Sequence, residues 1–333
     1  MKPRKILIIR NSAIGDVAIA ATLLRPYVQA NPEVEFTMVS TGFLQPLFDF
    51  GTENLKFIAT DFKNRHKGLK GLYRLSSTLR RTRPTVIADL HNVIRSRIIC
   101  GFLMDIPCFH LDKQRKARKA LTEGKKADIL PTIRKYEEVL VRCGLEDLGI
   151  GLPTDTCFKV RKKEGIRKIG IAPFSKHIGK EWPITSIDWV LEHFSSRKDW
   201  KFYLFGAGEK ERRLLEALAE KYDNVESLVG KQQLGKELEI IRGLDLMICT
   251  DSANLHFASY CGTPALSIWG ATHPSAGFYG WRQCPENALQ LDMECRPCSI
   301  YGNRPCRRKD YACMNGITPE TAIEKIASLL DGE

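Results

Sequence analysis

The residue types best suited to chemistry gather in the stretch 250–256, with the sequence TDSANLH. The apolar run before it predicts a buried strand, and the residues after it predict a short helix that ends at Gly262. Asp251 and Ser252 therefore fall where a strand ends and a helix begins, with His256 one helical turn beyond Ser252. Free backbone N–H groups and the positive end of the helix dipole favour a phosphate at such a position.

These residues also have a simpler interpretation, because Asp and Ser are the usual caps of a helix N-terminus. A second apolar run, 265–270, argues for more than a cap. It predicts a neighbouring strand that ends in Thr272 and His273. Two adjacent strand ends would then place polar groups on one edge, the usual ligand-binding edge of an open α/β sheet.

A strand–loop–helix unit also opens the chain. Residues 5–10 predict a strand, and the loop after it contains Ser12, Ala13 and Gly15, whose small size lets backbone approach a ligand closely. Asp16 begins the next helix, either as a cap or as a carboxylate at the ligand edge that acts as a general base. The dinucleotide fingerprint G-x-G-x-x-G is absent from this loop.

A third loop of this kind follows the predicted strand 169–173. It contains Ser175, Lys176 and Lys180. Hydroxyl and ammonium groups at the carboxyl end of a strand are good partners for phosphate oxygens. Pro183 suits the first turn of the helix that follows.

Apolar runs alternate with amphipathic segments along the whole chain. The predicted strands are 5–10, 34–39, 55–58, 86–91, 169–173, 200–205, 228–230, 244–249 and 265–270. In the basic segment 63–83, one apolar helix face is marked by Leu69, Leu72, Leu75 and Leu79. Strands that alternate with helices predict an α/β fold of two doubly wound domains that face each other across a cleft.

The length of 333 residues also suits about two domains. We expect them at 1–160 and 161–333, joined by a linker within 149–163, and the last helix, 319–330, could pack back on the N-terminal domain. The net charge of +12 predicts an anionic partner, such as nucleic acid, a phosphorylated sugar or an acidic membrane surface. No signal peptide and no membrane-spanning run is visible, so we expect a cytoplasmic protein whose 11 cysteines are mostly reduced.

The densest positive run is 113–119, followed by Lys125 and Lys126. It is either a solvated face or a clamp for an anionic acceptor, with Lys116 and Arg118 as its candidate contacts. Arg95, which begins the helix after strand 86–91, is a further acceptor candidate. The run lacks interleaved aromatic residues, which argues against nucleic acid as the partner.

Four cysteines, Cys295, Cys298, Cys306 and Cys313, lie near the C-terminus. The C-x-x-C pair with two further thiols is typical of a tetrahedral zinc site, but the spacing is irregular and a second C-x-x-C is missing. The alternatives are packed free thiols or a redox-sensitive loop.

Together these motifs resemble the ADP-heptose:lipopolysaccharide heptosyltransferases of glycosyltransferase family 9. The motifs that carry the resemblance are 9–16, 172–175, 180–183, 251–256 and 295–314. The resemblance implies a GT-B fold, in which two Rossmann-like domains bind the acceptor (N-terminal) and the nucleotide-sugar (C-terminal). It also implies a metal-independent, inverting transfer with Asp16 as the catalytic base.

By the same resemblance, Lys180 and His256 stabilise the diphosphate leaving group. The donor candidates are Ser175, Lys176, Lys180, Glu209, Glu211, Thr250, Asp251, Ser252, Ala253 and His256. Glu209 and Glu211 are alternatives for the nucleoside contact. The acceptor candidates are Ser12, Gly15, Arg95, Lys116 and Arg118. No cofactor is implied for the chemistry, and zinc at the tail cysteines would be structural.

The chain departs from the family pattern at Ala253, where members usually have glycine, and at Lys176, where many have a small hydroxyl residue. A methyl group at residue 253 could alter the approach of backbone to the donor. From the resemblance we expect ADP-heptose as donor and an anionic lipid-linked saccharide at the inner membrane surface as acceptor, without nucleic acid. The alternatives are a UDP- or GDP-sugar transferase, a nucleotide-sugar epimerase and, remotely, a zinc-containing nucleic-acid-binding protein.

Overall fold

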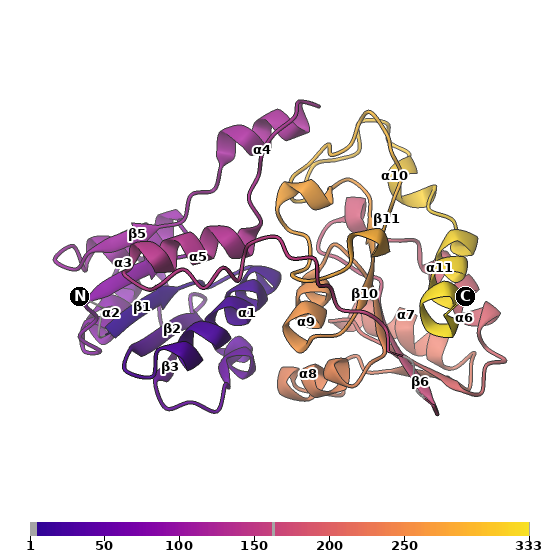
Figure 1. Cartoon of the computed structure of the whole chain (residues 1–333), viewed down its shortest axis with the longest axis horizontal. Coiled ribbons are helices and arrows are strands. Elements are labelled where there is room, and N and C mark those ends of the chain that lie inside the picture. Colours follow the sequence, from indigo (N-terminus) through magenta and orange to yellow (C-terminus); the bar gives the residue numbers. More distant parts are fainter. Residues whose placement is uncertain (1–4, 162–163, 333) are drawn as a thin grey trace. The chain divides into compact units, whose positions relative to one another are not determined.

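The computed structural model of the chain describes residues 5–161 and 164–332. The chain forms two compact units. The first comprises the residues up to Gln114 together with Leu130–Pro153, and the second comprises Arg115–Ile129 and the residues from Thr154 onward (Figure 1). The basic run around residue 118 thus belongs to the second unit, although it interrupts the sequence of the first.

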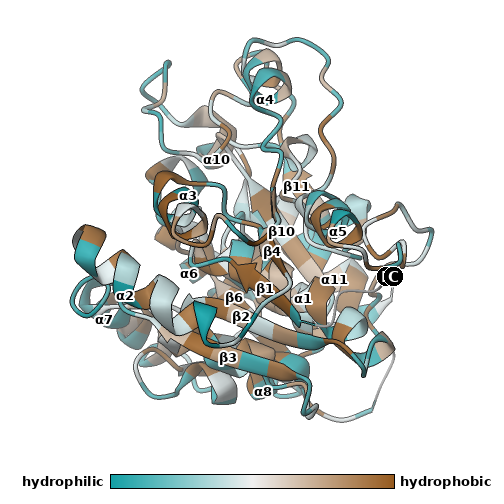
Figure 2. Ribbon diagram, turned by 90° about the vertical axis from the view of Figure 1, so that its left-hand side faces the viewer, coloured by the Kyte–Doolittle hydropathy of each residue, from teal (hydrophilic) through white to brown (hydrophobic). Residues whose placement is uncertain are grey.

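The first unit contains a five-stranded parallel sheet with the order β3-β2-β1-β4-β5. Its strands are β1 (Lys5–Ile9), β2 (Glu35–Thr41), β3 (Leu55–Thr60), β4 (Val86–Asp89) and β5 (Cys108–His110). The central β1 is paired on both sides, with Ile9 opposite Val39 and Asp89. Figure 2 shows hydrophobic residues along β1 and mixed character along the edge strand β3, as expected for a sheet covered by helices.

The helices of the first unit pack on this sheet. They are α1 (Ile14–Ala30), the 3₁₀ helix η1 (Gly42–Phe48), α2 (Gly68–Arg80), α3 (Ile94–Gly101) and α5 (Thr132–Arg142). The predicted helix 63–83 begins later, at Gly68, because the Asp61 carboxylate accepts the backbone N–H groups of Lys63 and Asn64 and closes a turn. Leu72 enters the core, but Leu69 at the first turn is 65% exposed, so its predicted place on the apolar face is wrong.

The second unit contains a six-stranded parallel sheet with the order β11-β10-β9-β6-β7-β8. Its strands are β6 (Arg167–Ala172), β7 (Trp200–Leu204), β8 (Val225–Ser227), β9 (Leu246–Thr250), β10 (Ala265–Trp269) and β11 (Ala288–Gln290). The strand predicted at 228–230 is wrong, because the observed strand lies earlier in the sequence. The chain pairs with β7 at Val225–Ser227 and then turns at Gly230, which has φ +70°.

The second unit contains α helices and short 3₁₀ helices and has a hydrophobic core of its own. They are α4 (Arg115–Thr122), η2 (Ile178–Lys180), α6 (Ile184–His193), α7 (Glu209–Ala219), α8 (Leu234–Arg242), α9 (Ala253–Cys261), η3 (Pro274–Ala276), η4 (Pro285–Asn287), α10 (Ala312–Asn315) and α11 (Pro319–Asp331). The last helix, α11, packs against α6 and contributes Ile326 to this core. The Trp182 indole N–H donates to Ile317 O at 2.9 Å and fastens the start of this segment.

One disulfide joins Cys157, which follows the inter-unit segment, to Cys284. The other nine cysteines are free thiols. The expectation of mostly reduced cysteines therefore needs a correction at this one pair. The same segment adds a backbone bridge between Phe158 and Gln283, so it is fastened to the second unit in two ways.

Candidate functional site

The main polar cluster of the second unit lies where the strand order reverses, between β6 and β9. Lys180, in the loop after β6, lies 3.2 Å from the Asp251 carboxylate at the end of β9. Thr272, which follows β10, donates its hydroxyl to the same carboxylate oxygen at 2.8 Å. Three strand ends thus converge on one buried carboxylate, at the position where open α/β sheets bind ligands.

Backbone packing holds this cluster in place. Gly179 O accepts the Ala271 N–H at 2.9 Å, and a Cβ on Gly179 would lie 2.9 Å from the Ala271 side chain. The loops after β6 and β10 therefore touch, which only a glycine at residue 179 permits. Gly302, with φ +74°, lies against the Lys180 stem and leaves room for it.

The start of α9 does not follow the simple capping interpretation. Ser252 occupies the N-cap position, but its hydroxyl makes no capping hydrogen bond. Within the described residues, the buried hydroxyl oxygens of Ser252 and Thr250 have no hydrogen-bond partner. Unsatisfied buried polar atoms are uncommon, and here they surround a helix N-terminus that attracts anions. This arrangement suits a phosphate better than it suits a cap.

The remaining donor candidates lie around this cluster. His256 is buried on α9, Ala253 begins that helix, Ser175 is half-buried and Lys176 is exposed. His177 lies between Lys176 and Lys180 in the sequence. Burial and the ammonium groups of these two lysines hold the pKa of His177 below its ordinary value, so its imidazole stays neutral near pH 7.

The two glutamate candidates differ sharply in their surroundings. Glu209 is exposed and forms ion pairs with Arg212 and Arg213 on its own helix. Glu211 is half-buried, and its carboxylate accepts the Ala207 N–H at 2.7 Å in the loop after β7. Burial raises the pKa of Glu211. Only Glu211 has its carboxylate at the edge of the sheet.

Sequence reasoning missed Arg296, between two of the tail cysteines. Its guanidinium donates to the carbonyls of Gly270 and Leu291 and, at 3.0 Å, of Thr272. Burial lowers its pKa. Arg296 thereby fixes the segment after β10 that presents Thr272 to Asp251. The C-x-x-C pattern drew attention to the thiols, whereas the arginine between them shapes the site.

The polar cluster of the first unit lies at its own reversal of strand order, between β1 and β4. Asp16, in the first turn of α1, forms an ion pair with Arg10 and lies 3.4 Å from the Tyr136 hydroxyl. Arg10 also donates to Leu90 O at 2.8 Å, so it links the ends of β1 and β4. These contacts orient the Asp16 carboxylate, whose side chain is 21% exposed.

His91, which follows β4, also belongs to this cluster, although the sequence analysis did not select it as a site residue. Its Nε2 lies 3.5 Å from the Ser12 hydroxyl. Burial, together with the Arg10 charge, lowers the pKa of His91 to about 4, so the ring is neutral near pH 7. Ser12, in the loop after β1, and Gly15, in the first turn of α1, both precede Asp16 closely, so these predicted residues lie together.

The basic acceptor candidates belong to both units. Arg95 is exposed and stacks over the Phe62 ring at 4.3 Å. Arg118 is buried in the second unit, where it donates to the Tyr301 hydroxyl at 2.7 Å and lies over the Phe278 ring. Lys116, on the same helix, is exposed. Arg118 is thus an anchor for α4 rather than a free cation in a mobile loop.

The thiol groups are arranged differently from the sequence prediction. Among the described residues, the ligand sets within 4.8 Å are Cys100–Cys108–His110 and Cys157–Cys284–Glu286. The tail cysteines Cys295, Cys298, Cys306 and Cys313 belong to neither set. Electrostatic coupling among them still marks them as neighbours.

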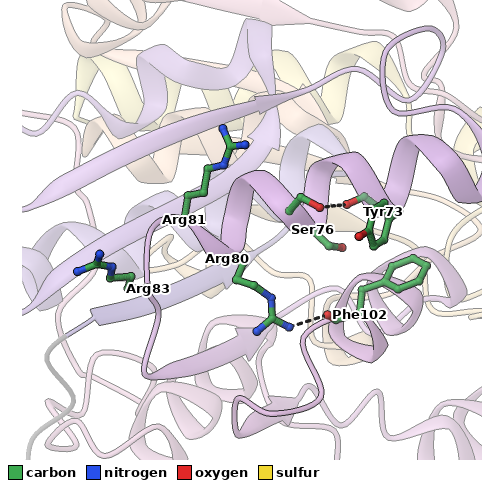
Figure 3. A pocket seen from close by; sticks show the side chains of 7 residues that line it. Tyr73, Ser76, Arg80, Arg81, Arg83 and Phe102 are labelled. Atoms are coloured by element: carbon green, nitrogen blue, oxygen red, sulfur yellow. Dashed lines mark hydrogen bonds between the residues drawn. The ribbon is translucent and has the colours of Figure 1, made fainter.

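A cavity of about 530 Å³ lies beside α2 in the first unit (Figure 3). Tyr73, Arg80, Arg81, Arg83 and Phe102 line it. Arg80 is committed to Asp105 through two hydrogen bonds of 2.7 and 2.8 Å.

Within residues 5–161 and 164–332, none of the helices is both long and apolar enough to cross a membrane.

Comparison with known proteins gives these clusters a context. The family profile described as Glycosyltransferase family 9 (heptosyltransferase) matches residues 72–309. A search of curated proteins yields no significant match. Among solved structures, a family 9 glycosyltransferase from Veillonella parvula is similar at 20% identity with a TM-score of 0.75, and the match covers 99% of this chain and 98% of that one.

Two E. coli structures are also similar. ADP-heptose lps heptosyltransferase II has 17% identity and a TM-score of 0.69, over 98% of this chain and 99% of its own. Heptosyltransferase WaaC with ADP has 16% identity and a TM-score of 0.68, over 97% of this chain and 99% of its own. At these identities the likeness concerns the fold, and it confirms the predicted GT-B type with two parallel-sheet α/β domains.

Proposed function

Because this chain belongs to glycosyltransferase family 9, the heptosyltransferases, we propose that it transfers heptose from ADP-heptose to a lipopolysaccharide core acceptor with inversion. The observation that carries the proposal is the Lys180–Asp251–Thr272 cluster beside the N-terminus of α9. This cluster combines a cation, unsatisfied hydroxyls and free backbone N–H groups, which are the groups that a nucleoside diphosphate requires.

The donor half of the reaction has to stabilise charge on the departing diphosphate. Lys180 would move from Asp251 toward the phosphates, and Asp251 would remain bound by Thr272. The helix dipole of α9 and His256 add further stabilisation in a partly dehydrated site. Such fixed groups can do the work of a divalent metal ion, and we therefore propose that the chemistry requires no metal.

The acceptor half requires a base for one hydroxyl group. In this proposal, Asp16 accepts the proton of the acceptor hydroxyl while that oxygen attacks C1 of the sugar. The bond from C1 to the diphosphate breaks in the same displacement, which inverts the anomeric centre. Arg10 and Tyr136 keep the carboxylate in one orientation, and neutral His91 adds a hydrogen-bonding group beside Ser12.

The lipid-linked acceptor suits a surface of the first unit that we call the α2–α3 surface. It combines exposed apolar side chains, namely Leu69, Tyr73, Ile94 and Met104, with exposed cations, namely Lys67, Lys70, Arg74, Arg81 and Arg83. Helices α2 and α3 pack together here, with the Tyr73 and Phe102 rings 5.5 Å apart. Apolar groups interleaved with cations favour contact with an anionic membrane surface.

Thermal unfolding in the presence of nucleotides tests the proposed donor. A ligand at about one hundred times its Kd adds roughly 2.7 kcal/mol to the free energy of unfolding. We expect ADP and ADP-heptose to stabilise the chain more than UDP, GDP or their sugars do. Stabilisation by UDP or GDP alone would overturn the donor and favour the other nucleotide-sugar activities. If none of these nucleotides stabilises the chain, the proposed site is contradicted. Ala253→Gly would then be the first substitution to test.

A further inference from the structure

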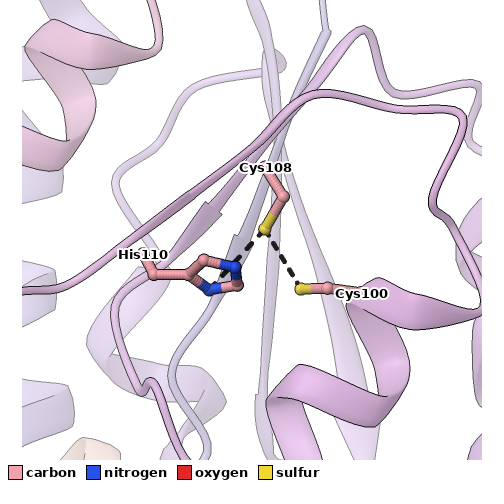
Figure 4. A group of neighbouring side chains, drawn as sticks. All are labelled: Cys100, Cys108 and His110. Carbon is pink, nitrogen blue, oxygen red and sulfur yellow. Dashed lines mark hydrogen bonds between the residues drawn. The ribbon is translucent and has the colours of Figure 1, made fainter.

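A compact cluster of sulfur and nitrogen atoms lies in the first unit, on α3 and β5. Cys100, at the end of α3, and Cys108, in β5, have their sulfur atoms 3.2 Å apart. Nδ1 of His110, two residues along β5, lies 3.8 Å from the Cys108 sulfur. Figure 4 shows the two thiols and the imidazole directed toward one another.

The spacing suits one shared cation. One ligand atom from each of the three residues lies within 4.8 Å of the other two. Around one Zn²⁺ ion, sulfur ligands at about 2.3 Å cannot be more than about 4.6 Å apart, so only small shifts would close the set. The sulfurs are also well beyond the bond length of a disulfide, about 2.05 Å, and they are therefore two thiols.

A buried carboxylate lies beside these ligand atoms. Asp89, which is fully buried, lies 2.9 Å from Nδ1 of His110 and accepts the Ser96 hydroxyl at 2.9 Å. Nδ1 is also the nitrogen that lies nearest the Cys108 sulfur, so a cation bound by Nδ1 would replace this hydrogen bond and would have the Asp89 oxygen beside it. Arg142 donates to the carbonyl of His110 and holds the end of β5 from the other side.

We propose that Cys100, Cys108 and His110 form a binding site for a thiophilic divalent cation of the zinc class. Binding releases the two thiol protons to solvent and forms two sulfur–metal bonds and one nitrogen–metal bond. A water molecule or the Asp89 carboxylate completes a tetrahedral set. With water as the fourth ligand, the two thiolates neutralise the divalent cation; with Asp89 as the fourth ligand, the site carries one net negative charge.

The site would stabilise the loop that borders the Asp16 cluster. Asp89 accepts the backbone N–H groups of His91 and Asn92 through its other oxygen, at 3.0 and 2.9 Å. The same carboxylate therefore connects the cation site to His91. A bound cation would tie α3, β5 and this loop together, and its role would be structural, independent of the donor chemistry.

Metal titration of the reduced, metal-free full chain tests the proposal. The four tail thiols Cys295, Cys298, Cys306 and Cys313 and the disulfide pair Cys157 and Cys284 are first replaced by serine, so that none of them contributes to the signal. In this background we expect one equivalent of Zn²⁺ to bind, and Co²⁺ to give the absorption of thiolate-to-metal charge transfer. Cys108→Ser and His110→Ala should each weaken binding by tenfold or more.

Cys249→Ser is the matched control, because Cys249 is a buried lone thiol in β9 of the second unit. It should leave the titration unchanged. Circular dichroism shows whether each variant is folded, and His110, with its side chain 23% exposed, is the substitution least prone to unfold the chain. Equal metal binding by wild type and His110→Ala would overturn the site. So would a reduced protein that takes up no metal but oxidises to a Cys100–Cys108 disulfide.

Discussion

At the scale of single residues, Asp16 has the most specific proposed role. Its carboxylate is partly exposed and is oriented by Arg10 and Tyr136. Asp16→Asn removes the proton acceptor and keeps the shape, so we expect transfer to fall by about 10²–10⁴-fold. Nucleotide binding should persist, measured by calorimetry on the same preparation. Asp112→Asn, on the surface, is the control, and loss of binding along with transfer would contradict a base.

Lys180 has a different expected signature, because it contacts the leaving group. Lys180→Ala should weaken diphosphate binding and lower kcat/KM by about 10²–10³-fold. Lys176→Ala, from an exposed neighbour in the same loop, should change both far less. Equal effects of the two substitutions in steady-state and binding assays would mean that the loop supplies only diffuse positive charge.

His91 predicts a pH dependence of stability. Its pKa is lowered to about 4 by burial, whereas an unfolded histidine titrates near about 6.5. Between these values the unfolded state binds the extra proton, so stability is full above about pH 6.5 and falls as the pH drops toward 4. The loss is at most about 3 kcal/mol, since one pKa unit corresponds to about 1.36 kcal/mol. Urea unfolding of wild type and His91→Gln should diverge with pH over this window, and parallel curves would exclude His91 as the cause.

At the scale of elements, α9 distinguishes a helix cap from a ligand site. Ser252 makes no capping hydrogen bond, whereas Thr318 caps α11 by accepting the Thr321 N–H at 3.3 Å. Thr318→Ala should therefore cost about 1 kcal/mol of stability, and Ser252→Ala clearly less. Ser252→Ala should weaken nucleotide binding more than Thr318→Ala does. Denaturant unfolding and calorimetry on both variants provide the comparison, and a full capping cost at Ser252 would restore the simpler interpretation.

The elements themselves were largely predictable, because hydrophobic period and stop signals act locally. The strand before Asp251 and the end of α9 at Gly262, with φ +77°, are confirmed. Short edge strands were not predictable: β5 and β11 have three residues each, too few for a visible period. The register of β8 and the first turn of α2 also failed, since pairing partners and the Asp61 turn decide them.

The sites were predictable only in part, for the same physical reason. Strand ends bring Lys180, Asp251 and Thr272 together whenever the sheet is parallel, and the sequence contains that information. Contacts between distant segments are different. No local pattern encodes the side-chain packing that brings Arg296 to the segment after β10, His91 to Ser12 and Arg118 to Tyr301.

At the scale of the whole molecule, the net charge of +12 predicts attraction to an anionic surface, and we propose the α2–α3 surface as the place where that attraction acts. Charge alone would make binding uniformly sensitive to salt. Exposed apolar side chains add a contribution that salt does not screen, since their burial among lipids is a hydrophobic effect. The two contributions can therefore be separated by experiment.

Sedimentation with lipid vesicles measures both. We expect binding to vesicles that contain an anionic phospholipid, little binding to neutral vesicles, and partial release by high salt. Leu69→Ser and Ile94→Ser, at side chains 65% and 81% exposed, should weaken the salt-resistant part severalfold without unfolding the chain. Trp189→Ser is the matched control, because that side chain is 59% exposed on α6 of the second unit. If Trp189→Ser weakens binding as much as Ile94→Ser does, membrane contact is not confined to the α2–α3 surface, and the acceptor must reach Asp16 by another route.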